Sequence, residues 1–533
     1  MLKKVEIFTL VLLIIFAFYC ALTIGSSWDE SYEMNIGKDR LKYLLSFGSY
    51  KYFNFHYYTE FYPAFYNTLA IFITKIFPNK YEIEIWHLTN TFFSILAVFG
   101  IYKITSNLFN KKVGKIVFLL CFINPTFFGH MAMNSKDTMI VFANVWATYI
   151  FLRYLQKQNI SNNRNRYILL AGLTVGFGTG VRLPFIATLF PLIIFAIVDI
   201  FFLKTITTPK FSIKKLTFDL IKVLTIAYLI VISTWPQVHS NIFIEPFKMF
   251  VAQTKLQSFG VNWILLNGNF FDTLYLPKSY IFINFFYKSP EFILLCYLIF
   301  IYFVVVNKKI FVTNFDYFWT KVFLILFIFL FPNIFFIFIP YRVYDGLRLF
   351  LYLVPYFNII PGLAIYCLIY NINSLKPKLI LGIVTSLFVY YMFIFISLTP
   401  YQYTYLNAFI GNYSNAHKKF ENDYWAISIK ELINKIPSET NLISNNKKVK
   451  IAFCGVPHNL SKRELNKLKN LRYEQKDLYA KDVDYIVMTN RTEESRDDNT
   501  LTNLETCFEK FEGEDLISVE RNGLMLSTMR KKL

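Results

Sequence analysis

Residues 3–25 read KKVEIFTLVLLIIFAFYCALTIG, and residues 25–37 continue as GSSWDESYEMNIG. The first stretch is a nearly unbroken apolar run, and about 20 such residues are enough to cross a bilayer. It is longer than the apolar region of a signal peptide, so we expect a retained membrane helix. The second stretch places two adjacent carboxylates, Asp29 and Glu30, at the point where the chain leaves the membrane.

The composition of the whole chain is that of an integral membrane protein. Of 533 residues, 55% are hydrophobic and 20% aromatic, and the mean hydropathy is +0.40, values outside the range of soluble globular domains. Apolar runs recur up to residue 398 and then stop. We predict eleven crossings, at about 5–25, 86–105, 113–130, 138–155, 167–181, 184–203, 216–235, 290–306, 320–340, 348–370 and 377–398.

The sequence therefore predicts an all-α polytopic membrane domain over residues 1–399. The rest of the chain, residues 400–533, has a different pattern. The segments VKIAFCGVP (449–457), SKRELNKLKNLRYEQ (461–475) and VDYIVMTN (483–490) are typical of a strand, a helix and a strand. We expect a small C-terminal α/β domain there.

The net charge of +20 is concentrated in the membrane part. Residues 400–533 hold 21 Lys and Arg against 19 Asp and Glu, so +18 of the excess lies in the first 399 residues. Cytoplasmic loops of membrane proteins are rich in Lys and Arg, which explains this excess without a nucleic-acid partner.

The same rule sets the expected topology. With a cytoplasmic N-terminus, the inner loops collect 20 of the 34 basic residues of the first 399 and only four acidic residues. This holds if residues 61–77 form a helix lying at the outer interface instead of a twelfth crossing. The outer loops are then 26–85 and 236–289, and the C-terminal domain is extracytoplasmic.

Charged residues at membrane level are costly and usually functional, and here they gather on the outer side. They belong to the turn after the first span and to three further turns, HMAMNSKDT (130–138), GTGVRLPF (178–185) and PYRVYDGLRLF (340–350). The candidates are Asp29, Glu30, Lys136, Asp137, Arg182, Tyr344, Asp345 and Arg348. Cations beside carboxylates suit a lipid phosphate as one substrate and a hydroxyl that must lose a proton as the other.

These motifs carry a resemblance. A first span ending in WDE, then FGHMAMNSKDT (128–138), GVRLP (180–184), YDGLRLFLYLVP (344–355) and a late PYQYTY block (400–405) are similar to polytopic GT-C glycosyltransferases. The nearest branch is that of bacterial protein O-mannosyltransferase-like and aminoarabinose-transferase-like enzymes, the glycosyltransferase family 39-like group. The resemblance covers roughly residues 1–430 and implies a GT-C-like fold.

The resemblance also implies a mechanism. The donor would be a polyprenyl-monophosphate sugar, and Asp29 would be the general base in an inverting transfer, with Glu30 orienting the acceptor or pairing with a cation. Arg182, Arg348 and Lys136 would bind the donor phosphate. Asp137, Tyr344 and Asp345 would shape the acceptor pocket. The family more often has Pro where this chain has Ser135, which loosens that turn.

Several of these assignments have a structural alternative. Asp29 and Glu30 could simply be a solvated helix end. Arg182 could extend to the interface, and residues 344–346 could be only a turn, because Asp-Gly is a common turn pair. The segment ENDYWAIS (421–428) could contact the acceptor or pack the C-terminal domain onto the membrane part. His56, His87 and His130 lack metal-ligand spacing, so core or interface histidines are expected.

No cofactor is required by these patterns. A divalent cation near Asp29, Glu30 and His56 stays open as an alternative. Four cysteines lie in apolar runs and are expected to be core residues. Cys454 and Cys507 could form a disulfide if the C-terminal domain is outside the cell.

The sequence thus predicts a plasma-membrane glycosyltransferase that acts at the outer face on a polyprenyl-phosphate sugar and on a lipid, glycan or protein acceptor. One alternative is a transporter or flippase of a lipid-linked sugar, although charges at one surface and the lack of inverted repeats disfavour it. Another is an outer-face glycan polymerase or ligase with a pyrophosphate-linked donor.

Overall fold

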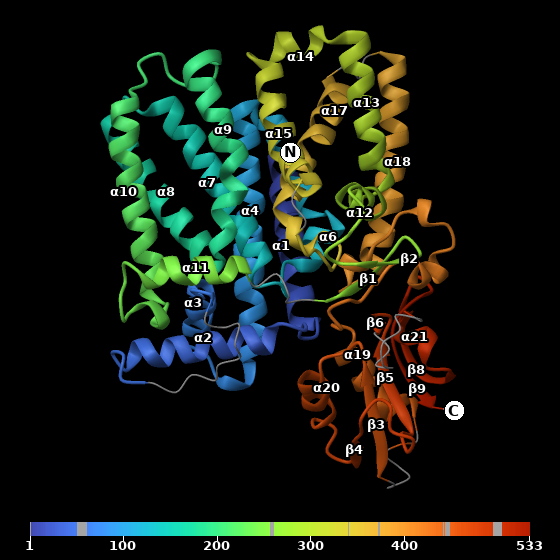
Figure 1. The fold of residues 1–533 in the computed structure, drawn as a ribbon. Coiled ribbons are helices and arrows are strands. Elements are labelled where there is room, and N and C mark those ends of the chain that lie inside the picture. Colours follow the sequence, from blue (N-terminus) through green and yellow to red (C-terminus); the bar gives the residue numbers. More distant parts are fainter. Residues whose placement is uncertain are drawn as a thin grey trace.

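The computed structural model describes residues 2–50, 61–255, 261–338, 341–370, 374–440, 442, 448–493 and 504–532. Helices run between the two ends of the membrane part, and the C-terminal sheet lies at one of these ends (Figure 1). The predicted fold class, a helical polytopic part followed by a small α/β part, is confirmed.

Eight helices in the described part of the chain are long and apolar enough to cross a membrane. They are α1 (Leu2–Thr23), α4 with its preceding turn (Asn79–Leu108), α7 (Asp137–Lys157), the stretch Leu183–Leu203 around α9 (Phe190–Val198), α10 (Ile213–Ser233), α15 (Phe318–Phe338), the stretch Arg348–Tyr370 with α16 (Val354–Phe357) and α17 (Ile359–Tyr370), and α18 (Leu375–Ser397). A ninth would be formed by α12 (Tyr280–Lys288) and α13 (Glu291–Asn307), which meet at 111°.

The predicted count of eleven spans is therefore not confirmed. The predicted span 113–130 is divided into α5 (Lys111–Phe122) and α6 (Pro125–His130), because Asn124 caps the second helix with its side chain on the Phe127 N–H. The predicted span 167–181 lies in α8 (Ser161–Val181), whose first turns, SNNRNR, are polar. The segment 61–77 contains α3 (Phe65–Thr74), which at about 15 Å is too short to cross.

Small residues set the packing of α8 on α10. A Cβ added to Gly172 would lie 2.7 Å from the Cβ of Ile226, and one added to Gly176 would lie 2.8 Å from the Cα of Ala227. These distances leave no room for a side chain. Glycine lets the two backbones approach closely, as at many interfaces between membrane helices.

Shorter elements cover the end of the membrane part that faces the C-terminal sheet. Helix α2 (Glu30–Leu45) lies across this end, with α3 and α11 (Glu245–Lys255) nearby (Figure 1). The hairpin of β1 (Trp263–Leu266) and β2 (Asn269–Asp272) turns at Asn267 and Gly268, which both have positive φ, as a two-residue Asn-Gly turn requires.

The C-terminal part is built on a five-stranded sheet of order β4-β3-β5-β9-β8. Its strands are β3 (Val449–Cys454), β4 (Tyr473–Gln475), β5 (Tyr485–Thr489), β8 (Gly513–Arg521) and β9 (Leu524–Lys532). Helix α19 (Ile429–Glu439) packs against β8 and β9, and α20 (His458–Leu465) packs against α19. The predicted strands at 449–457 and 483–490 are confirmed.

The prediction of a helix over 461–475 is wrong beyond Leu465. Helix α20 ends there, and residues 473–475 form β4, which pairs in parallel with β3. The reason is tertiary: pairing beside β3 gives the backbone of this segment ladder hydrogen bonds that its helical pattern did not reveal.

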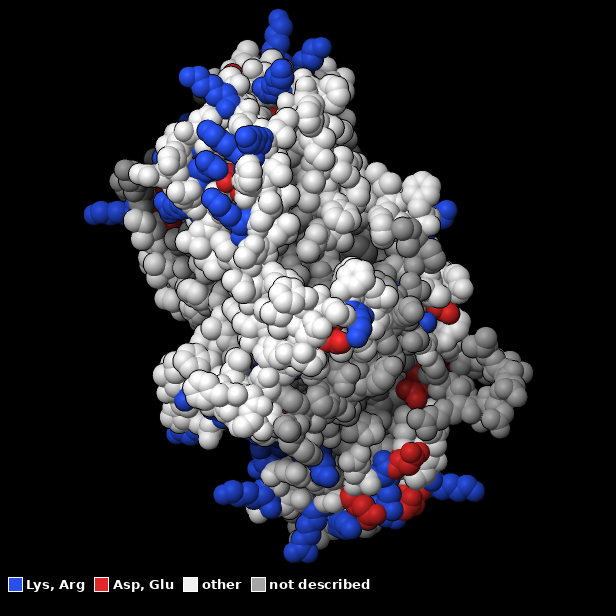
Figure 2. Space-filling model, turned by 60° about the vertical axis from the view of Figure 1, so that its left-hand side comes forward, with Lys and Arg blue, Asp and Glu red and all other residues white. Residues whose placement is uncertain are grey.

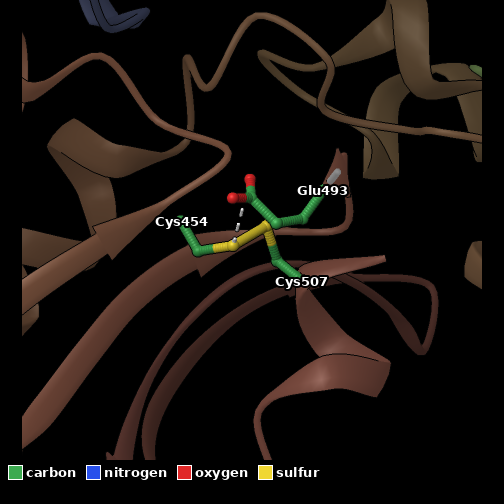
Figure 3. A group of neighbouring side chains, drawn as sticks. All are labelled: Cys454, Glu493 and Cys507. Carbon is green, nitrogen blue, oxygen red and sulfur yellow. Dashed lines mark hydrogen bonds between the residues drawn. A yellow bond between two sulfur atoms is a disulfide. The ribbon is translucent and has the colours of Figure 1, made fainter. Parts of the chain in front are cut away.

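A disulfide joins the end of β3 to the start of α21 (Cys507–Lys510) through Cys454 and Cys507 (Figure 3). The possibility raised by the sequence is thereby confirmed. The other four cysteines, Cys20, Cys121, Cys296 and Cys367, are free and buried, as expected of core residues.

Charge is distributed unevenly along the molecule. Lys and Arg side chains gather at the end opposite the C-terminal sheet, whereas near that sheet they are mixed with Asp and Glu (Figure 2). The basic end carries α14 (Lys309–Asn314) and the loop between α9 and α10 (Figure 1).

Candidate active site

Arg348 is the centre of a cluster of charged side chains at the end of the bundle that faces the C-terminal sheet. Its Nη2 lies 2.5 Å from Oδ2 of Asp29, its Nε 2.9 Å from Oδ2 of Asp137 and its Nη1 3.0 Å from Oδ2 of Asp345. The side chain of Arg348 is only 5% exposed. Four of the predicted site residues, from three distant segments, thus meet around one cation.

Helix starts and a tight turn position the three carboxylates. Asp29 immediately precedes α2, and Asp137 is the first residue of α7, where a negative charge is favoured by the helix dipole. Asp345 and Gly346 both have positive φ, at 59° and 63°, a backbone form that Asp and Gly adopt more easily than other residues. The predicted Asp-Gly turn is present, and its carboxylate is part of the cluster.

Asn134 holds the turn in which this chain has Ser135. Its Oδ1 accepts hydrogen bonds from the backbone N–H of Lys136 at 3.2 Å and of Asp137 at 2.8 Å, and its Nδ2 donates to Oδ2 of Asp137 at 3.1 Å. The side chain of Asn134 therefore fixes the geometry that a proline would otherwise restrict.

Lys136 and Arg182 lie at the edge of the cluster. Lys136 forms an ion pair with Glu33, and its Nζ is 4.8 Å from the ring centroid of Tyr62. Nη1 of Arg182 lies 3.2 Å from Oδ1 of Asp137. Arg182 thus contributes to the cluster instead of only reaching the interface. Glu33 was not predicted, although it follows Asp29 at the helical spacing of one turn.

Glu30 does not join Asp29. Its Oε1 lies 2.7 Å from Nε2 of His87, and its Oε2 accepts a hydrogen bond of 2.6 Å from the Ser27 N–H. The Nδ1 of His87 faces the carbonyl oxygen of Ala21 at 3.1 Å. Glu30 and His87 are both buried, so this pair ties the start of α2 to α1 and α4.

The remaining aromatic and histidine candidates lie close to the cluster. The Tyr344 ring centroid is 5.8 Å from Cζ of Arg348, and burial raises the pKa of the Tyr344 hydroxyl, so this hydroxyl stays protonated at neutral pH. His130 is fully buried, with Nε2 2.7 Å from the Tyr424 hydroxyl, as expected of a core histidine.

Two residues beyond position 400 also belong to the cluster. Nε1 of Trp425 donates to Oδ2 of Asp345 at 3.1 Å, and the Trp425 ring centroid lies 4.4 Å from Cζ of Arg348. Nη2 of Arg491 lies 3.1 Å from Oδ1 of Asp345. For the segment of Trp425 the sequence had favoured packing of the C-terminal part over an acceptor contact, and no pattern pointed to Arg491.

Asp29 differs from the other two carboxylates in exposure and charge. Its side chain is 31% exposed, against 5% for Asp137 and 2% for Asp345. Burial by itself would raise the pKa of the Asp29 carboxyl, but the positive charges of Arg348 and Lys136 outweigh that effect and hold this pKa below its ordinary value. Asp29 is therefore an ionised and accessible carboxylate at neutral pH.

The carboxylates of this cluster pair with Arg348, and metal-ligand spacing is found elsewhere in the part of the chain that the structure describes. There, the group with metal-ligand spacing is Cys454, Glu493 and Cys507 (Figure 3), and its two sulfur atoms are bonded to each other, so they cannot act as thiolate ligands. His56, named as part of an alternative cation site, lies outside the described residues, and both Glu30 oxygens already have partners.

Comparison with known proteins relates part of this chain to a family. Residues 63–229 match the family model described as dolichyl-phosphate-mannose-protein mannosyltransferase, which confirms the resemblance to GT-C glycosyltransferases. The matched segment contains Lys136, Asp137 and Arg182. No curated protein matches the chain in sequence.

Solved structures give weaker likenesses. ArnT from Cupriavidus metallidurans in the apo state is 11% identical, with 99% of this chain and 98% of that chain covered and a TM-score of 0.49. The same protein bound to undecaprenyl phosphate is 11% identical over 98% and 97%, with a TM-score of 0.45. The apo Archaeoglobus fulgidus oligosaccharyltransferase is 12% identical over 90% and 69%, with a TM-score of 0.42.

Proposed function

We propose that this protein is a membrane glycosyltransferase that moves one sugar from a polyprenyl-monophosphate-sugar donor to an acceptor hydroxyl. The observation that carries the proposal is the accessible, ionised carboxylate of Asp29 beside partly exposed cations. The family match over residues 63–229 supports the reaction class.

Asp29 is the general base in this proposal. The acceptor hydroxyl gives its proton to the Asp29 carboxylate while its oxygen forms a bond to C1 of the sugar. The bond between C1 and the phosphate oxygen breaks, its electron pair leaves with the polyprenyl phosphate, and the configuration at C1 is inverted. Proton transfer to a positioned base typically contributes about 10²–10⁴ in rate.

Arg182 and Lys136 are the proposed ligands of the donor phosphate. Their side chains are 20% and 11% exposed, more than the 5% of Arg348. Each of them faces one carboxylate, whereas three nitrogens of Arg348 are already taken by three carboxylates. We therefore assign Arg348 to holding Asp29 in place, although the sequence had suggested it as a phosphate ligand. Fixed cations stabilise the negative charge that develops on the leaving phosphate.

The acceptor would lie on the side of Asp29 that is open. Tyr344, Asp345 and Asp137 are proposed to shape this pocket, while Glu30 is proposed to secure the turn of the base through its contact with His87. The proposed acceptor is a hydroxyl group of a lipid, a glycan or a protein. Because Arg182 and Lys136 supply positive charge, transfer is proposed not to need a divalent cation.

The proposed location is the outer face of the plasma membrane. The cluster lies at the end of the helical bundle that faces the C-terminal sheet, whereas Lys and Arg gather at the opposite end (Figure 2), and basic ends of membrane proteins are normally cytoplasmic. Residues 1–399 would then be the membrane catalytic domain and residues 400–533 an extracytoplasmic domain.

Transfer from radiolabelled polyprenyl-monophosphate sugars tests the proposal. Membranes with the wild-type chain, Asp29→Asn or the control Asp477→Asn, an exposed aspartate of the C-terminal part, are compared for product and for donor consumption, with and without EDTA. We expect transfer in the wild type and the control, unaffected by EDTA, and a loss of about 10²–10⁴-fold in Asp29→Asn.

Three other results of this assay would contradict the proposal or a part of it. Full transfer by Asp29→Asn would show that Asp29 is not the base. If the wild-type chain neither transfers nor consumes any monophosphate donor, the proposal fails, and pyrophosphate-linked donors and lipid-linked sugar transport are tested next. Loss of transfer in EDTA would restore the divalent cation as part of the site.

A further inference from the structure

Residues from the C-terminal part of the chain contact the turn that carries Asp29. A Cβ added to Gly25 would lie 2.3 Å from the carbonyl oxygen of Ile427, so the two backbones are in close contact. Nη2 of Arg463 donates to Oγ of Ser26 at 2.8 Å.

The contacts with the C-terminal part continue toward Asp29. The backbone N–H of Trp28 donates to the carbonyl oxygen of Trp425 at 3.2 Å. Contacts therefore follow one another from Gly25 to Trp28, the residue that directly precedes Asp29.

Arg491 adds a side-chain contact at the same place. Its Cζ lies 5.1 Å from the ring centroid of Trp28, and its guanidinium pairs with Asp345 and donates to the carbonyl oxygen of Tyr424. The residue is 8% exposed. The buried guanidinium of Arg491 therefore contacts Trp28, the residue before Asp29. It also pairs with Asp345, which in turn pairs with Arg348.

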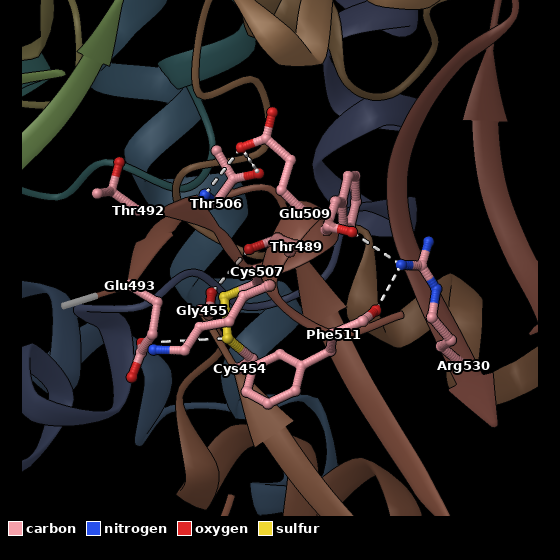
Figure 4. The surroundings of a disulfide bond; sticks show 12 residues. Cys454, Gly455, Thr489, Thr492, Glu493, Thr506, Cys507, Glu509, Phe511 and Arg530 are labelled. Carbon is pink, nitrogen blue, oxygen red and sulfur yellow. Dashed lines mark hydrogen bonds between the residues drawn. A yellow bond between two sulfur atoms is a disulfide. The ribbon is translucent and has the colours of Figure 1, made fainter. Parts of the chain in front are cut away.

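The C-terminal fold fixes the backbone of Arg491. The carbonyl oxygen of Arg491 accepts a hydrogen bond of 2.9 Å from the N–H of Cys507, which is bonded to Cys454. A Cβ on Gly455 would lie 2.8 Å from the Cβ of Arg491. Figure 4 shows the surroundings of the disulfide, which lies beside Gly455 and Thr489.

We infer that Arg491 is a positioning residue through which the C-terminal part sets the place of the Asp29 carboxylate. This inference rests on the proposed function. Arg491 pairs with Oδ1 of Asp345, while Arg348 pairs with Oδ2. Arg491 therefore balances part of the negative charge of Asp345, and Arg348 can pair with Asp29 through Nη2. Without Arg491, Asp345 has only Arg348 as its guanidinium partner, and the pairing of Arg348 with Asp29 weakens. The ring of Trp28 also loses the cation that covers it.

The charged and titratable groups around Asp29 determine what a pH profile would report. They are Arg348, Lys136, Asp137, Tyr32, Tyr344 and Arg491. Weakening of the Arg348 pair would let the pKa of Asp29 rise toward its ordinary value, because an opposite charge in contact lowers a carboxyl pKa by about 1–3 units.

The test compares Arg491→Ala and Arg491→Lys with the wild type and with Arg472→Ala, which alters an exposed arginine of the same part of the chain. Initial rates are measured with radiolabelled polyprenyl-monophosphate sugars against donor concentration and pH. We expect kcat of Arg491→Ala to fall about 10–100-fold, since small misplacements of reacting groups cost up to about 10², with the KM for donor changed less than about threefold. The acid limb should move up by about one pH unit.

Each further outcome decides something. Arg491→Lys should recover part of the rate, and if the alanine variant does not accumulate, the lysine variant alone is decisive. Wild-type kcat and pH profile in either variant, or a fall in rate with an unmoved acid limb, would overturn the inference while leaving the proposed function intact. Absence of transfer in the wild type would instead reject the proposed function.

Discussion

Asp29 and Arg348 are 319 positions apart in the chain, and their side chains form an ion pair with Oδ2 2.5 Å from Nη2. The same guanidinium also holds Asp137 and Asp345. One arginine therefore fixes the relative positions of the turn after α1, the start of α7 and the 344–348 turn. Removing one partner of such a buried group usually costs more than the pair contributes, because the remaining charge is left unpaired.

The pH dependence of transfer should follow the ionisation of Asp29. Since the pKa of this carboxyl is held below its ordinary value of 3.8, the charged base persists as the pH falls, and activity should be lost only below about pH 4. In Lys136→Met, one of the two cations that lower this pKa is gone, so the acid limb of kcat/KM should move to higher pH. An acid limb that is unchanged in Lys136→Met would contradict the assignment of Asp29.

The lowered pKa of Asp29 also makes the stability of the fold depend on pH. Because the pKa of Asp29 is lowered by folding, its contribution to the free energy of unfolding is present above pH 4 and is lost as the pH falls through the lower value of the folded state.

Arg182 should govern the affinity for donor. A hydrogen bond to a charged group is worth about 1.5–3 kcal/mol, so Arg182→Ala should raise the KM for donor about 10–100-fold. Arg182→Lys should recover part of this affinity, because lysine keeps the charge without the two-pronged geometry. The matched control is Arg166→Ala, an exposed arginine at the start of α8. An unchanged KM in Arg182→Ala would remove Arg182 from the phosphate site.

The close contact of α8 and α10 should be sensitive to the size of residue 172. Gly172→Val places a side chain where a Cβ is already within 2.7 Å of Ile226, and such overpacking typically costs about 1–3 kcal/mol. Gly382→Val is the control, because a Cβ at Gly382 would meet nothing within 4 Å and the change in helix propensity is the same. Thermal unfolding in detergent should show a lower Tm for Gly172→Val only.

The disulfide should stabilise the C-terminal sheet. It links Cys454 to Cys507 across 53 positions, and bonds of this kind contribute about 2–4 kcal/mol. The double variant Cys454→Ser/Cys507→Ser should therefore have a lower Tm than the wild type. Dithiothreitol should lower the Tm of the wild type and leave that of the double variant unchanged, whereas an equal shift in both would point to a different cause.

The sequence was a good guide to which membrane turns lie together, because charges beside apolar runs stand out. Asp29, Asp137, Asp345 and Arg348 each lie next to a helix that hydropathy locates, so their convergence at one end of a bundle followed from topology. The turn at Asp345 and Gly346 was likewise visible as a turn pair.

Partners were harder to predict than positions. Glu30 was grouped with Asp29 because the two are adjacent, yet successive residues at a helix start point in different directions, and Glu30 faces His87. Arg491 follows a strand in the C-terminal part, and only the packing of that part against the end of the helical bundle brings it to Asp345. The break between α5 and α6 was missed because both pieces are apolar, and hydropathy does not register a cap.

The contact of Glu30 with His87 has a consequence for hydrogen placement. The Ala21 carbonyl can only accept, so Nδ1 of His87 carries a hydrogen. The 2.7 Å between Nε2 and the Glu30 carboxyl then requires one more hydrogen, on the imidazole or on the carboxyl. In either case that hydrogen is shared between the two side chains, and a substitution at position 87 keeps the turn before α2 in place only if the new side chain hydrogen-bonds both the Ala21 carbonyl oxygen and the Glu30 carboxyl.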